Sequence, residues 1–151
     1  MREVTLGVRG FWSTEWTRET RPSTSMDEVP VGAVIVSQGQ VIARAHNLCE
    51  RLRDFTAHAE MQAFTSASEY LGGKFLDKCT LYVTLEPCPM CAGAAFWTRI
   101  GRVVYGAKDE KRGHSKFDGE LTMLHPKTEC QGGLLADEAA ALMTAFFRAK
   151  R

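Results

Sequence analysis

Short runs of apolar and β-branched residues alternate with amphipathic segments along most of the chain. Residues 31–36 form a continuous apolar run that ends in a Ser-Gln-Gly turn, and residues 40–45 follow as the second arm of a predicted hairpin. Similar runs at residues 80–85 and 102–105 predict a third and a fourth strand. Residues 131–135 predict a short fifth strand.

Three segments between and after these strands carry apolar residues at helical spacing. The first helix is predicted from His58 to Gly72-Gly73, and the second starts beside Pro87 and Pro89, because proline is tolerated in the first turn of a helix. The third follows Asp137, and its predicted buried side holds Leu142, Met143, Phe146 and Phe147. The alternative that one of the two phenylalanines is exposed for stacking stays open. This alternation predicts an α/β fold with three layers, α/β/α, in which a mixed central sheet of about five strands is flanked by helices.

Residues 1–28 show no sustained pattern of this kind. Gly7, Gly10 and Pro22 interrupt helical spacing, and Ser and Thr are frequent between residues 13 and 25. We therefore predict one domain over residues 29–151, preceded by a segment, residues 1–28, in which no regular helix is expected.

The composition is that of an ordinary globular chain. The net charge is +1, so no global field attracts the chain to nucleic acid, although a local basic patch is compatible with that sum. No apolar run approaches the ~20 residues that a membrane helix needs. Charged residues interrupt the start of the chain, and five cysteines is an odd number, which favours reduced thiols and a cytoplasmic location over secretion.

The candidate chemistry lies between Thr56 and Cys91. This stretch opens with Thr-Ala-His58-Ala-Glu60 and closes with Glu-Pro-Cys88-Pro-Met-Cys91. One imidazole and two thiols suit Zn²⁺, and a zinc ion with three protein ligands keeps its fourth position for water. The order His-x-Glu and then Pro-Cys-x-x-Cys is the signature of zinc-dependent base deaminases, and the match requires five residues at fixed spacing.

The remaining carboxylate fits a proton shuttle. Bound zinc lowers the pKa of water from 15.7 to roughly 7, but an exocyclic amine leaves only as neutral ammonia. A group must therefore take the proton from the water and deliver it to the ring nitrogen and then to the amine. Glu60, two residues after His58, is the candidate for this role.

Several further stretches extend the likeness beyond the zinc motif. From about Glu28 to Arg151 the sequence resembles the cytidine deaminase-like superfamily and, more narrowly, the bacterial tRNA-specific adenosine deaminases. The resemblance rests on residues 29–36, 46–47, 56–60, 84–88, 91–94, 99–107 and 146–148. That family begins with an amphipathic helix, whereas residues 1–25 do not have the pattern of one.

The resemblance implies a substrate, a partner and further site residues. The substrate is the wobble adenosine of a tRNA anticodon, which is converted to inosine by a homodimer with the helix after Pro87 at its interface. Asn47 then contacts the flipped base, and Lys108 and Asp109 lie beside the RNA. On the last helix, Phe147, Arg148 and the terminal Lys150 and Arg151 meet the anticodon arm.

Other readings of these residues stay open from the sequence alone. A structural zinc site would need a fourth ligand from Cys49, Cys79, His114 or His125, and none of these has a suitable spacing. Asn47 alone is typical of a turn, and the Lys108–Lys116 loop is typical of a solvated surface. A guanine-type deaminase that acts on the free base shares the motif wording and an aromatic-Trp pair like Phe96-Trp97. The remaining alternative is a non-catalytic, zinc-stabilised RNA-binding subunit, which would not need Glu60.

Overall fold

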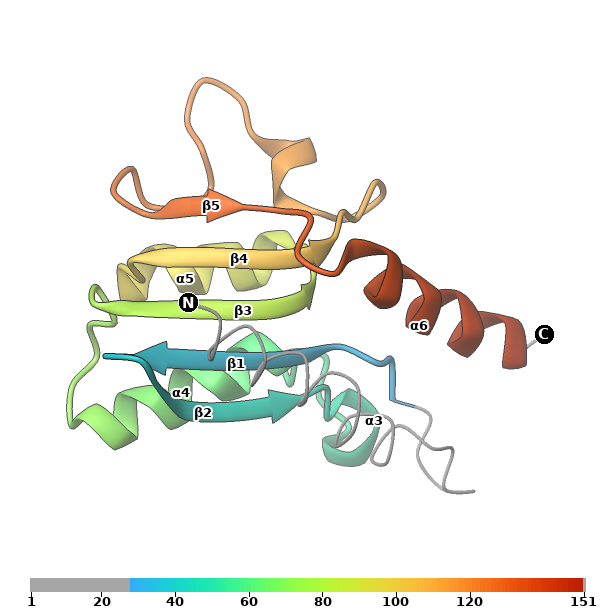
Figure 1. Cartoon of the computed structure of the whole chain (residues 1–151), viewed down its shortest axis with the longest axis horizontal. Helices are drawn as coiled ribbons and strands as arrows, with labels where there is room; N and C mark the ends of the chain where they lie inside the picture. Colours follow the sequence, from blue (N-terminus) through green and yellow to red (C-terminus); the bar gives the residue numbers. More distant parts are fainter. Residues whose placement is uncertain (1–27, 151) are drawn as a thin grey trace.

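The computed structural model describes residues 28–150, which form a mixed five-stranded sheet with helices packed along it (Figure 1). The strands are β1 (Gly32–Ser37), β2 (Gln40–His46), β3 (Cys79–Leu85), β4 (Arg102–Ala107) and β5 (Glu129–Gln131). The helices are α3 (Cys49–Leu52), α4 (Ala59–Leu71), α5 (Pro89–Thr98), the 3-10 helix η2 (His114–Phe117) and α6 (Ala136–Ala149). The predictions for residues 1–28 fall, apart from Glu28, outside the described residues.

The sheet order is β2-β1-β3-β4-β5, and its two halves differ in direction. β1 pairs antiparallel with β2 and β3, whereas β4 pairs parallel with β3 and β5. The β1–β2 hairpin closes through Gln38 and Gly39, which have φ values of 51° and 75°. Two successive positive φ values are the requirement of a tight hairpin turn, and glycine meets it without strain.

Both faces of the central strands are buried, which explains the continuous apolar run in β1. Ala33 and Ile35 point into the larger core, which α4 and α5 cover on one face of the sheet (Figure 1). Val34 and Val36 belong to a second cluster on the other face. The start of α6 packs closely on strand β4. A Cβ atom on Gly106 of β4 would lie only 3.1 Å from the Cβ of Ala139 in the first turn of the helix.

The predicted mixed α/β fold is confirmed, with two corrections near its C-terminal end. The fifth strand lies at Glu129–Gln131 instead of residues 131–135, because Leu134 and Leu135 turn away to pack on the second cluster. In α6 only Ala139 is buried, and Phe147 is 48% exposed, so its predicted burial is wrong. The helix extends past the C-terminal ends of β3 and β4 (Figure 1), and its last residues, 147–149, are exposed.

No helix within residues 28–150 combines the length and the apolar content that crossing a membrane requires.

Candidate active site

Two helix N-termini bring the motif residues to one place. His58 is the N-cap residue of α4 and Cys88 is the N-cap residue of α5, each with extended backbone angles and no side-chain capping bond. α4 and α5 pack against each other, so their first turns converge. A helix N-terminus carries partial positive charge and unpaired N–H groups, which favour an anionic ligand such as a thiolate.

The three predicted ligands form one cluster. Ligand atoms of His58, Cys88 and Cys91 all lie within 4.8 Å of one another. The Nδ1 atom of His58 is 3.6 Å from the Sγ atom of Cys88 and 3.4 Å from the Sγ atom of Cys91. A tetrahedral zinc ion with Zn–N of ~2.05 Å and Zn–S of ~2.3 Å separates N and S by about 3.6 Å. The donor set and its spacing therefore fit a zinc ion.

Within residues 28–150, no other histidine, cysteine or carboxylate joins this cluster, so a four-ligand structural site is not formed there. Of the candidate fourth ligands, His114 is buried with both ring nitrogens unpaired, and the His125 ring packs against Phe96. A three-ligand set leaves one tetrahedral position for water or substrate.

The two thiols differ in their tendency to ionise. Hydrogen bonds with Cys91 and, to a smaller extent, with His58 lower the pKa of Cys88 to about 4. For Cys91, the hydrogen bond to Cys88 and burial raise the pKa above its ordinary value. The hydrogen bond with Cys88 likewise raises the pKa of His58. Coordination to a cation reverses the effect on Cys91, because a metal-bound thiol is deprotonated outright.

Glu60 lies in the first turn of α4 and is 4% exposed. Burial raises the pKa of this carboxyl to about 7. A proton donor and acceptor is most effective when its pKa is close to the working pH. Glu60 is therefore a buried carboxyl beside the His58–Cys88–Cys91 cluster whose pKa lies near neutrality, so it can both accept and donate a proton.

Asn47 connects the hairpin to the start of α4. It follows β2, is 8% exposed, and its Oδ1 atom accepts a hydrogen bond of 2.8 Å from the backbone N–H of Ala59. This bond satisfies one of the free N–H groups of the helix, a task that the N-cap side chain usually performs. The carbonyl oxygen of Asn47 is thus committed to holding the helix, and its NH₂ group is the part left for a ligand.

A cavity of about 580 Å³, here called the substrate cavity, adjoins the metal-ligating cluster. The predicted site residues Asn47, His58, Glu60, Cys88 and Asp109 line it. The structure does not bring Lys108, Phe147 or Arg148 to its wall, because Phe147 and Arg148 lie on the exposed part of α6. Arg112, which belongs to the Lys108–Lys116 loop, also lines it. Five further charged or aromatic lining residues were missed by sequence reasoning: Glu28, Glu50, Phe55, Glu86 and Phe117.

Of these, Glu86 had a signal in the sequence, because this carboxylate directly follows a buried strand and precedes Pro87. It is 2% exposed, and its Oε2 atom accepts hydrogen bonds from the N–H and the hydroxyl of Ser115. Asp109 shapes the same loop, since its Oδ1 atom accepts the N–H groups of Lys111 and Arg112. The other missed residues gave no sequence signal, because Glu28 and Phe55 lie in irregular segments and Glu50 and Phe117 lie in helical segments of only four residues.

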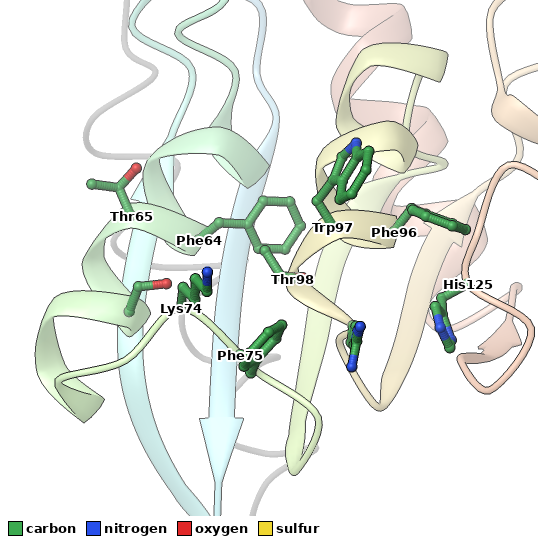
Figure 2. A pocket seen from close by; sticks show the side chains of 10 residues that line it. Phe64, Thr65, Lys74, Phe75, Phe96, Trp97, Thr98 and His125 are labelled. Carbon is green, nitrogen blue, oxygen red and sulfur yellow. The ribbon is translucent and has the colours of Figure 1, made fainter.

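A second depression, the α4–α5 groove, lies at the opposite end of the two helices and has a volume of about 710 Å³ (Figure 2). Aromatic side chains dominate its wall, and Trp97 is 78% exposed. The Phe75 ring has the Arg99 guanidinium 4.9 Å from its centroid. The groove residues are Phe64, Thr65, Ser68, Lys74, Phe75, Phe96, Trp97, Thr98, Arg99 and His125.

Comparison with known proteins agrees with this geometry. The model of the MafB19-like deaminase family matches residues 12–151. A tRNA-specific adenosine deaminase of Bacillus subtilis is 44% identical over 147 residues, covering 93% of this chain and 89% of its own length. A solved structure from studies of A-to-I editing by tRNA:A34 deaminases at the wobble position superimposes with a TM-score of 0.73 at 41% identity. That alignment covers 85% of this chain and 99% of the other.

A guanine deaminase of Bacillus subtilis is also similar, at 37% identity and a TM-score of 0.58, but covers only 72% of this chain and 66% of its own. A guanine deaminase from Nitrosomonas europaea superimposes with a TM-score of 0.68 over 87% of this chain, but at only 25% identity. The tRNA:A34 deaminase structure has both the higher TM-score and the higher identity. The chain belongs to the deaminases and, among them, to the tRNA-specific adenosine deaminase family.

Proposed function

We propose that this protein is a zinc-dependent deaminase that converts the wobble adenosine of a tRNA anticodon to inosine. One observation carries the proposal: a three-ligand cluster and a buried Glu60 adjoin a single cavity, in a chain whose relatives of matching length are tRNA-specific adenosine deaminases. Zinc held by His58, Cys88 and Cys91 would supply a Lewis acid that activates water at neutral pH.

The chain's own residues supply the proton transfers. In the proposed reaction the oxygen of water adds to C6 of adenine, the bond from C6 to the exocyclic nitrogen breaks, and ammonia leaves. Glu60 accepts one proton from the water and delivers it to N1 of the ring. It then takes the proton of the new hydroxyl on C6 and transfers it to the departing amine, which leaves the carbonyl group of inosine. Asn47 lines the same cavity, and its Oδ1 atom is occupied by the N–H of Ala59, so its NH₂ group would donate to an acceptor on the base edge.

The anticodon arm is proposed as the RNA partner. Lys108 and Asp109 lie on the loop beside the cavity, and Arg148 lies near the end of α6, outside it. Under this proposal Lys108, Asp109 and Arg148 contact the part of the anticodon arm that surrounds the extruded base. They do not contact the base. Phosphate contacts position a nucleic acid and do not read its sequence.

A homodimer is proposed with the α4–α5 groove at its interface. Two aromatic residues of the groove are strongly exposed, Trp97 at 78% and Phe75 at 47%. Exposed aromatic side chains gathered on one surface are characteristic of protein interfaces. A twofold dimer would bury the same groove on both copies.

The test compares two substrates. The zinc-loaded protein is incubated with an anticodon stem-loop carrying a wobble adenosine and, separately, with guanine, and inosine and xanthine are quantified. We expect inosine in the RNA and little xanthine. Xanthine formed with an untouched stem-loop would support the guanine-type reaction, and RNA binding without turnover of either substrate would support a non-catalytic subunit.

A further inference from the structure

Two phenylalanines at the substrate cavity have no place in the reaction described above. Phe55 and Phe117 both line the cavity, yet they are 90% and 52% exposed. They come from separate segments, one from the loop before α4 and the other from the end of η2. Large apolar side chains that stay in water beside a polar, catalytic cavity are candidates for ligand contact.

The backbone that carries Phe55 is held firmly although its side chain is not. The Oδ1 atom of Asp54 accepts hydrogen bonds from the N–H of Thr56, at 2.8 Å, and from its hydroxyl, at 2.7 Å. The N–H of Asp54 donates to the carbonyl of Cys49, and the N–H of Ala57 donates to the carbonyl of Asp54. The turn therefore presents the Phe55 ring from a fixed base.

Phe117 is anchored by a different set of contacts. Two residues before it, Ser115 donates both its N–H and its hydroxyl to Glu86, at 3.1 and 2.8 Å. The neighbouring His114 is buried, and its backbone N–H donates a hydrogen bond to the carbonyl of Pro87. A Cβ on Gly113 would come within 2.1 Å of the Glu86 carboxylate, so the loop lies directly on that group. The buried Glu86 thus fixes the segment that carries the second exposed ring.

We propose that Phe55 and Phe117 are stacking platforms for the nucleotides on either side of the reacting base. The inference rests on the proposed function and names the part of the substrate that these rings recognise. A base can enter the cavity only after it leaves the stack, and its neighbours then lose stacking partners. Aromatic side chains replace that stacking on single-stranded RNA regardless of sequence, because every base has a π-face.

The test uses alanine, leucine and tryptophan variants of each phenylalanine with the wobble-adenosine stem-loop. Phe55→Ala and Phe117→Ala are each expected to raise KM by roughly 5- to 150-fold, the range for one lost base–aromatic stack. Their kcat stays near wild type, because an interaction made equally in the bound and transition states affects KM alone. Tryptophan restores KM, whereas leucine, which is apolar but has no π-face, does not. Leu121→Ala is the matched control, since Leu121 is 85% exposed and lies outside the cavity wall.

Stem-loops with an abasic nucleotide 5′ or 3′ of the adenosine identify the stacked neighbour. If Phe55 stacks on one of these two neighbouring bases, removing that base raises KM for the wild-type protein. Phe55→Ala then has no further effect on KM with that stem-loop. Phe117→Ala is expected to behave in the same way with the other base. Unchanged KM values in both alanine variants, or full rescue by leucine, would overturn the inference while the proposed function stands. A wild-type protein that leaves the stem-loop untouched would overturn both.

Discussion

The two ends of the α4–α5 helix pair have opposite chemistry. At their N-terminal ends, His58 and Cys88 occupy the N-cap positions beside a buried carboxylate. Further along the same helices, the α4–α5 groove is lined by aromatic rings, with Trp97 largely in solvent (Figure 2). Both ends rest on one apolar core, so the difference between them comes from side chains and helix polarity, not from separate folds.

The difference indicates how one helix pair can serve two purposes. Free N–H groups and a partial positive charge at helix N-termini favour thiolates and a metal centre. The later turns have no such field, and their outward residues are free to be aromatic and to bind another surface. Substitutions at one end are therefore expected to leave the other intact, and each prediction below tests that independence.

The largest effect is expected from the ligand cluster. Cys88→Ser and Cys91→Ser should each lose zinc and activity together, because serine replaces a thiolate with a poor zinc ligand in a set of only three. Elemental analysis and stem-loop deamination measure the two losses, and circular dichroism checks that the fold persists. Full zinc occupancy in both variants would refute the assignment. Self-association through the groove should be unaffected.

Glu60→Gln should lower turnover by at least ~100-fold while zinc content and RNA affinity remain, since the change keeps the shape of the side chain and removes the base. Glu60 is proposed to handle several transfers, so the loss should exceed that of a single one. Single-turnover deamination and a binding titration separate the two properties. A variant that keeps a tenth of the wild-type rate would mean that another group moves the protons.

How much of this could be predicted from sequence depends on whether a residue lies in a regular element. The first four strands and α4 and α5 were predicted within a few residues, because their apolar spacing is strong and both sheet faces are buried. The motif placed His58, Cys88 and Cys91 together, since both segments begin helices after strand or loop residues. The structure adds that His58 and Cys88 are themselves N-cap residues, which only backbone angles reveal.

Residues in loops could not be found in this way. Phe55 reaches the cavity because of a turn built by Asp54, and Phe117 because Glu86 holds Ser115 across 29 residues of sequence. Neither contact leaves a periodic trace. Sequence spacing also overstated the burial of α6, because an amphipathic pattern indicates an apolar side but not how far the partner surface extends.

The groove should respond to Trp97→Glu. If a second copy docks there, a buried charge in place of an exposed aromatic anchor should weaken self-association by about 30-fold or more, the scale of an interface hot spot. Sedimentation velocity over a dilution series measures the change, and zinc content should stay that of the wild type. Leu121→Glu is the control, because it places the same charge on an 85% exposed residue outside the groove. Equal dimerisation of both variants would remove the groove from the interface.

The smallest effect concerns the C-terminal cations, and it has two competing explanations. Arg148 and Lys150 follow acidic residues in the first turn of α6, a distribution that stabilises a helix through its dipole without any RNA. The Lys150 ammonium also lies 5.0 Å from the centre of the Phe146 ring. Contact with the anticodon arm instead predicts that replacing Arg148, Lys150 and Arg151 by alanine flattens the dependence of log affinity on log salt. Each lost phosphate contact contributes ~0.7–0.9 to that slope, so the change is at most about 2–3.

The control for this triple variant replaces Arg44, Lys78 and Lys127, three cations on other exposed surfaces, by alanine. Both variants change the net charge from +1 to −2, because each removes three cations, so a difference between them reports position and not total charge. We expect the C-terminal variant to have the flatter slope, with fluorescence anisotropy of a labelled stem-loop as the measurement. Turnover at saturating RNA should stay near wild type in both, since Arg148, Lys150 and the three control cations do not line the substrate cavity. Identical slopes in the two variants would assign Arg148 and Lys150 to the stability of α6 and place the phosphate contacts elsewhere on the molecule.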